Sequence, residues 1–102
     1  MRNITANAIL NLKEQPQSLY VHGSIMVYRM DDTIKISKVS PQGINPSILV
    51  LDLEIVNGSG PMKGVPKLFH YEDSSELATS YNQVTIRYAK DASITVNIEI
   101  AG

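Results

Sequence analysis

The sequence predicts an all-β domain, and we expect a seven-stranded antiparallel β-sandwich of immunoglobulin-like architecture, with a small β-barrel as the alternative. Two observations support this prediction. Residues 94–100 alternate apolar and polar side chains without a fault, which is typical of a strand with one buried face. Similar runs recur along the chain, with turn residues mostly about every 8 to 14 positions.

Length and composition restrict the architecture and the chemistry. The 102 residues fit one domain, which we expect to span residues 1–102. The absence of cysteine excludes disulfides, thiol nucleophiles and cysteine zinc sites. The net charge of −1 argues against a protein that binds nucleic acid independently of sequence, because such a protein needs a basic face. We expect no cofactor.

The chain shows no pattern that would direct it to a membrane. Its longest wholly apolar run, residues 48–51, is far shorter than a membrane-spanning segment. The first residues lack the apolar core of a signal peptide. We therefore expect no membrane insertion. The compartment stays unassigned, with the cytoplasm favoured and an exported mature domain as the alternative.

Apolar alternation and chain-breaking residues set the strand boundaries. Pro16 ends the first strand, since proline lacks the N–H that a central ladder needs. Asp31 and Asp32 separate the second and third strands, which we expect to form a hairpin. The predicted strands cover residues 4–13, 19–30, 33–39, 47–57, 67–72, 83–89 and 94–100.

Glycine and proline mark the longer connections. Residues 40–46 and 57–66 are both predicted loops, and half of the second segment is glycine or proline. Residues 73–76 resemble a helix N-cap box, followed by one helical turn at most. Residues 90–93 are predicted to be a hairpin loop. Tyr81 stands where β-sandwiches often keep a corner tyrosine.

The second strand carries a surplus apolar face. A two-layer sandwich buries one face of each strand, yet this segment is apolar on both sides. We expect one face, with Leu19 and Val27, to enter the core. Tyrosine and methionine are enriched at protein interfaces, which marks the other face as a candidate interaction surface. Its members are Tyr20, Met26, Tyr28 and Met30. As an alternative, a bulge at Gly23 would flip the register and divide the run between the core and a loop.

The loop over residues 57–66 is a second candidate interaction site. Long loops on rigid scaffolds often carry function. Pro61 would stiffen this one, Met62 would provide an adaptable apolar tip, and Lys63 a charge. The phosphate-loop pattern is missing, because Lys63 precedes the last glycine and no long helix follows.

Two further classes of function stay open. One is a carbohydrate- or small-ligand-binding sandwich with aromatic stacking platforms, for which the candidates are Tyr20, Tyr28, Phe69, Tyr71 and Tyr88. The other is a small hydrolase or metal enzyme centred on His70, with Glu72 on the same strand face and His22 as the only other imidazole. No nucleophile elbow accompanies them, and we expect no enzyme.

We therefore predict a non-enzymatic interaction or structural module that binds a protein partner or itself. Self-association as a homo-oligomer is expected because small β domains must cover their sheet edges. The sequence does not identify the partner, the biological process or the strand order.

Overall fold

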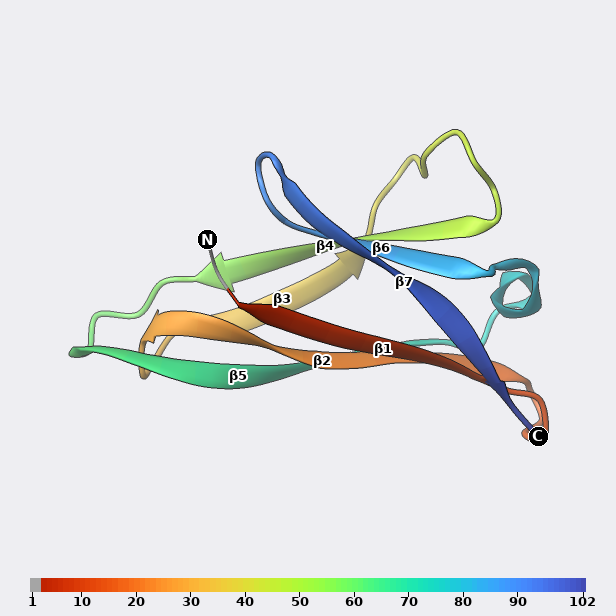
Figure 1. The fold of residues 1–102 in the computed structure, drawn as a ribbon, viewed down its shortest axis with the longest axis horizontal. Coiled ribbons are helices and arrows are strands. Elements are labelled where there is room, and N and C mark those ends of the chain that lie inside the picture. The colour runs from red at the N-terminus through yellow and green to blue at the C-terminus, as the bar shows by residue number, and fades with distance from the viewer. Residues whose placement is uncertain (1–2) are drawn as a thin grey trace.

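The computed structural model describes residues 3–102, which form seven strands and one short 3₁₀ helix (Figure 1). The elements in chain order are β1 (Ile4–Asn11), β2 (Ser18–Arg29), β3 (Thr33–Lys38), β4 (Ile48–Val56), β5 (Met62–Asp73), η1 (Glu76–Ser80), β6 (Gln83–Ala89) and β7 (Ala92–Ala101). The prediction of an all-β fold is confirmed.

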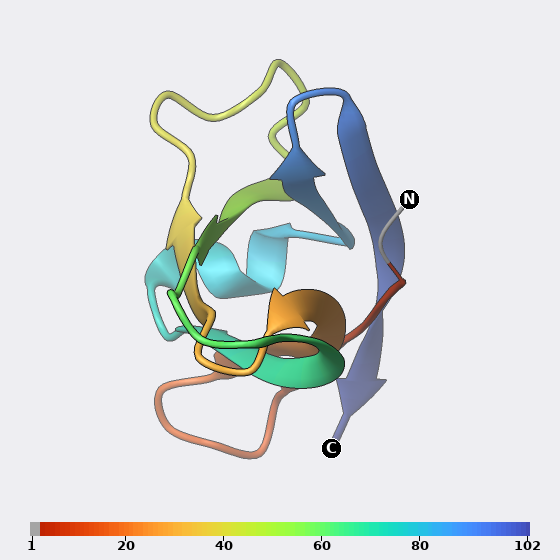
Figure 2. The ribbon, with the colours of Figure 1, turned by 90° about the vertical axis from the view of Figure 1, so that its left-hand side faces the viewer.

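The strands form one sheet that curls on itself. Its order is β3-β4-β6-β7-β1-β2-β5, and the two outer strands, β3 and β5, come close without forming a ladder. Seen end-on in Figure 2, the strands surround a common interior as a nearly closed barrel. The alternative of a small barrel fits this sheet, whereas the immunoglobulin-like sandwich is not confirmed.

Strand direction also differs from the expectation of an antiparallel sheet. Within residues 3–102, four ladders are antiparallel, while β1 pairs with β7 and β4 pairs with β6 in parallel. Parallel neighbours need a long connection between them. Such long-range pairing leaves no local pattern in the sequence, so periodicity alone did not reveal it.

The long strand β7 joins the two halves of the sheet. Its first part, Ser93–Asn97, pairs with β6, and its last part, Ile98–Ala101, pairs with β1 (Figure 1). The predicted alternation is present as far as Ile98: Ile94, Val96 and Ile98 are half-buried and the polar residues between them are exposed, whereas Ile100, expected on the same buried face, is 68% exposed. One continuous apolar row therefore serves both halves of the barrel.

The core consists of the inward rows of the strands. In β2, Leu19, Val21, Ile25 and Val27 are completely buried. In β4, Leu49 and Leu51 are buried in the same way, and Leu53 nearly so. The predicted inward face of β2 is thus confirmed, and β4 is a central strand with a neighbour on each side.

Gly23 keeps the phase of β2 instead of shifting it. The ladders to β1 and β5 run through Gly23 without a register shift, so the alternative of a bulge at this position is wrong. A Cβ here would overlap the Thr5 carbonyl oxygen and lie 2.9 Å from Ala6 Cα. The neighbouring backbone occupies the space, and glycine fills the position because it has no side chain.

The predicted hairpin between β2 and β3 is wrong. These strands do not pair; β2 lies between β1 and β5, and β3 pairs with β4. The tight turn, closed by the Asp32 amide donating to the Arg29 carbonyl at 3.1 Å, carries the chain from one half of the sheet to the other. The two aspartates bind another loop, described below, and do not close a ladder.

The strand β5 is twice as long as predicted. It begins at Met62 and not at Lys67, so Gly64 and Pro66 lie inside it. Proline is tolerated because β5 is the last strand in the sheet, where one side of the backbone needs no ladder partner. The predicted loop shortens accordingly. The N-cap is confirmed at Ser75, whose side chain accepts from the Leu77 amide at 3.3 Å.

Candidate functional site

Two consecutive carboxylates fix the loop that leads into β5. Asp31 accepts from the amides of Ser59 and Gly60 at 3.0 Å, and buried Asp32 accepts from the Gly58 amide at 2.7 Å. Arg29 adds a hydrogen bond from its guanidinium to the Gly60 carbonyl. We call this arrangement the aspartate clasp. It ties the end of β2 to the beginning of β5.

The clasp depends on small residues and on charge. A Cβ at Gly58 would overlap the Asp31 carboxylate, and one at Gly60 would lie 2.8 Å from Asp31 Oδ1. Backbone hydrogen bonds from Gly60 and Ser59 lower the pKa of Asp31 from its usual value. The hydrogen bond from Gly58 likewise lowers the pKa of Asp32. Both carboxylates are thereby held in the charged form that binds the loop.

The ladder between β2 and β5 aligns two outward rows of residues. Ladder pairs bring Ser24 opposite Leu68 and Met26 opposite Pro66. We call this surface the β2–β5 face: it comprises the outward residues Met26, Tyr28, Pro66 and Leu68 of the two strands, together with exposed Met30 in the turn after β2 and exposed Met62 at the start of β5. A Cβ at Gly64 would lie 3.6 Å from the end of the Met26 side chain, so the methionine lies close over the neighbouring strand.

Much of this face is open to solvent. Tyr28 is 49% exposed, Met30 50%, Met62 67% and Leu68 85%. The two candidate sites predicted separately, on the second strand and in the loop after residue 57, therefore meet on one surface. The two segments come together because β2 pairs with β5, although the register of this ladder shifts between Val27 and Arg29, where Arg29 lies opposite Met62.

Three predicted residues lie outside the centre of this face. Tyr20 is also outward on β2, but its hydroxyl donates to Glu14 Oε1 at 2.5 Å near the opposite end of the strand. That hydrogen bond raises the pKa of Tyr20. Pro61 is exposed in the loop just before β5, and Lys63 is exposed on the first residues of β5. Both lie at the margin of the β2–β5 face.

The two histidines face each other on neighbouring strands. His22 of β2 lies directly opposite His70 of β5, and both are exposed. The Tyr20 and His70 rings have their centroids 6.1 Å apart. Glu72 lies opposite Tyr20 and accepts a hydrogen bond from Ser74. Over the described part of the chain, no group of three or more His, Cys, Asp or Glu side chains is arranged to hold a metal ion.

The five aromatic candidates for sugar stacking are dispersed. Phe69 is buried in the core. Tyr71 and Tyr88 lie on inward rows against it, whereas Tyr28 is half-exposed on the outer surface. Each of four surface hollows on residues 3–102 is lined by at most one of these five rings.

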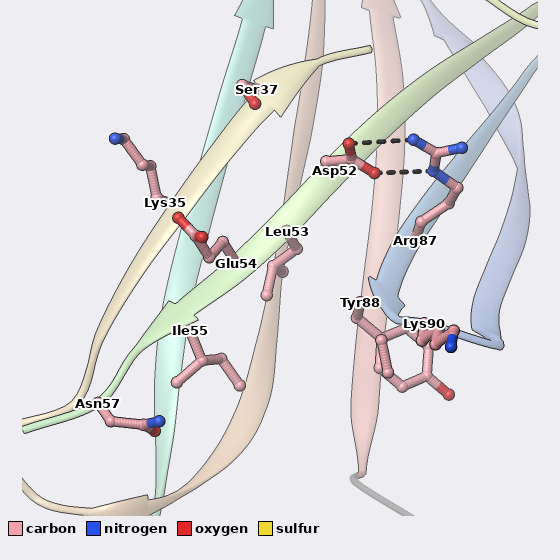
Figure 3. A pocket seen from close by; sticks show the side chains of 11 residues that line it. Lys35, Ser37, Asp52, Leu53, Glu54, Ile55, Asn57, Arg87, Tyr88 and Lys90 are labelled. Atoms are coloured by element: carbon pink, nitrogen blue, oxygen red, sulfur yellow. Dashed lines mark hydrogen bonds and ion pairs between the residues drawn. The ribbon is translucent and has the colours of Figure 1, made fainter.

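A cleft that the sequence analysis did not predict lies on the other half of the sheet (Figure 3). The hollow has a volume of about 690 Å³ and lies along β3, β4 and the end of β6. Leu53, Ile55 and Tyr88 supply apolar surface. The charged side chains that line the cleft are Lys35, Asp52, Glu54, Arg87 and Lys90.

One ion pair crosses this cleft at its narrow end. Arg87 of β6 binds Asp52 of β4 through two hydrogen bonds, of 2.7 and 3.0 Å (Figure 3). Hydrogen bonding to Arg87 lowers the pKa of Asp52, and the same contact raises the pKa of Arg87. Both side chains are about half exposed, so solvent screens the pair and it adds little stability.

Comparisons with family models, with curated proteins and with solved structures find no match for this chain. Within the described residues, no helix has the length and apolar character needed to cross a membrane. The site must therefore be interpreted from its own geometry.

Proposed function

We propose that this protein is a non-enzymatic interaction module that associates with a second copy of itself through the β2–β5 face. The observation that carries the proposal is the exposure of four large apolar side chains on this one surface: Tyr28, Met30, Met62 and Leu68. Contiguous exposed apolar surface on a soluble domain is typical of a binding site. Tyrosine and methionine are among the residues enriched at such sites.

The charge distribution favours a second copy as the partner. In the rows that run from Ser24 to Tyr28 and from Gly64 to Leu68, no outward residue carries a charge. Two copies can therefore approach face to face without bringing like charges together, which would be costly in a desolvated interface. A twofold dimer uses the same surface on both subunits and needs only this self-complementarity.

The position of the face at the sheet margin supports the same conclusion. β5 is an outer strand of the sheet, and outer strands with apolar outward residues tend to associate unless they are covered. Burial of the face in a dimer would remove this exposed surface. The association would then serve a structural or assembly role, since it requires no chemistry.

The test replaces two exposed residues of the face and leaves the core unchanged. In sedimentation experiments over a range of concentrations, the wild-type protein should associate, whereas Met30→Ser combined with Leu68→Ser should remain monomeric. Leu77→Ser is the matched control, because Leu77 is 53% exposed on η1, away from the face. It should associate like the wild type.

Thermal unfolding of all three proteins separates loss of association from loss of folding. The double variant should keep the circular dichroism spectrum of the monomeric fold. If it associates as strongly as the wild type, the β2–β5 face is not the interface and the proposal is wrong.

A further inference from the structure

The cleft of Figure 3 lies where two paired strands separate. The ladder between β4 and β6 ends at Asp52 and Arg87, but β4 continues to Val56 while β6 turns into β7. Beyond Asp52, no described strand pairs with this edge of β4. We propose that the cleft binds an extended peptide segment of a partner protein, in which acidic and apolar residues alternate, as an added strand on this edge.

The backbone of β4 is oriented for such pairing. The Val50 carbonyl accepts from the Val39 amide at 3.1 Å, which places the Val50 backbone groups on the side of β3. Because backbone groups alternate between the two edges of a strand, those of Asp52 and Glu54 also face β3. The backbone groups of Leu53 and Ile55 therefore lie on the other edge, where the pair Asp52–Arg87 uses the Leu53 amide and leaves the Leu53 carbonyl and both backbone groups of Ile55 facing the cleft. Addition of a strand to such an edge is a recurrent mode of peptide recognition.

The side chains around the cleft specify an alternating pattern in the added segment. Successive residues of a strand point to opposite faces of the sheet. One set would point inward, against Leu53, Ile55 and Tyr88, which favours apolar residues. The other set would point outward, beside the charged side chains of β3, β4 and the β6–β7 turn. The segment therefore needs apolar residues alternating with polar ones.

The charges on the outer surface favour acidic residues at the polar positions. Arg87 and Asp52 neutralise each other in their ion pair. Three charged residues then remain around the cleft: Lys35, Lys90 and Glu54. Neither lysine lies within ion-pair distance of a described carboxylate. The two lysines and one glutamate together carry one net positive charge. This charge complements a negatively charged segment.

The open strand edge favours a peptide. The volume of about 690 Å³ leaves room for a ligand beside this edge. An extended backbone would bind the Ile55 backbone groups and the Leu53 carbonyl as the next strand of the sheet. The cleft lies on β3, β4 and β6, separate from β2 and β5, so this proposal does not depend on self-association.

The test uses a fluorescent synthetic peptide in which Val or Ile alternates with Glu. Fluorescence anisotropy should show saturable binding to the wild-type protein. A peptide with Lys in place of each Glu should bind about tenfold more weakly, equivalent to about 1.4 kcal/mol. A peptide methylated at alternate backbone amides should not bind, since it cannot form the added ladder.

Charge reversal in the protein provides the matched comparison. Lys90→Glu should weaken binding of the acidic peptide about tenfold, again about 1.4 kcal/mol. Lys13→Glu should leave binding unchanged, because Lys13 is exposed in the turn after β1, beside Gly102 and outside the cleft. Leu68→Ser should also leave it unchanged, which separates this site from the β2–β5 face. No saturable binding of the acidic peptide, or equal binding of the Glu and Lys peptides, would overturn the proposal.

Discussion

At the scale of single residues, Gly23 decides which side of β2 enters the core. Its neighbours approach so closely that a methyl group cannot be accommodated by moving a flexible side chain. The obstacles are the backbone of Thr5 and Ala6 in β1. On β5, the Phe69 ring would lie 2.8 Å from a Cβ at Gly23. The absence of a side chain here preserves one register from Leu19 to Val27. That register places Tyr28 and Met26 on the outside.

We therefore expect Gly23→Ala to destabilise the protein by about 1–3 kcal/mol or more, as overpacking of a tightly packed position does. Gly43→Ala is the matched control, because its Cβ would meet only Val50 Cγ2, at an ordinary 3.7 Å. It should change stability by less than about 0.5 kcal/mol. Urea unfolding of both variants measures the difference. Equal stabilities would show that β1 and β5 yield easily around Gly23.

At the scale of elements, the aspartate clasp joins the turn after β2 to the loop before β5. Neither segment has an internal ladder, so their positions depend on the amides of residues 58–60 donating to Asp31 and Asp32. The lowered pKa of each carboxylate means that the unfolded chain binds protons more readily than the folded one in acid. The stabilisation is present above the unfolded pKa of about 3.9 and is lost as pH falls through the folded pKa.

This linkage predicts a specific pH dependence. The free energy of unfolding of the wild type should fall as the pH is lowered through the unfolded aspartate pKa of about 3.9 and then through the lower folded pKa of these carboxylates. Asp31→Asn combined with Asp32→Asn should be less stable than the wild type near neutral pH and should show a flatter slope. Asp91→Asn, in the exposed β6–β7 turn, is the control. Identical slopes for the double variant and the wild type would contradict a stabilising role of the clasp.

The strands themselves were easier to predict from the sequence than the way in which they pair. Strand existence and inward faces were predictable, because alternation in β2, β4 and β7 is a local property of the chain. The partners of each strand were not, since pairing of β4 with β6 or of β1 with β7 joins distant segments. Asp31-Asp32 was wrongly assigned to a hairpin, because its amide partners come from residues 58–60.

The candidate site was predictable only in its parts. The outward row of β2 followed from periodicity, and its exposure at Tyr28 and Met30 agrees with that prediction. Leu68 could not be added to this row from the sequence alone. It joins the row because β5 begins at Met62 and pairs with β2. Because a proline such as Pro66 usually ends a strand, the sequence predicted that this strand begins only at residue 67. The cleft could not be predicted at all, because it arises where β4 and β6 separate.

At the scale of the whole molecule, the sheet order explains why two surfaces suited to binding remain. When a sheet closes around its own core, the backbone N–H and C=O groups of its outer strands find partners within the sheet. Here the sheet is nearly closed, and β7 spans both halves. The β2–β5 face lies on one half, and the cleft beside β4 lies on the other. We propose that the first surface binds a second copy of the chain and that the cleft beside β4 binds a peptide.

The most direct test of the central claim is the molar mass of the wild-type protein, measured by static light scattering across a tenfold dilution at constant salt. The account predicts a mass above that of one chain at the highest concentration, falling towards the monomer as the protein is diluted or staying constant if the dimer is tight. The mass of a single chain at every concentration would contradict self-association through the β2–β5 face.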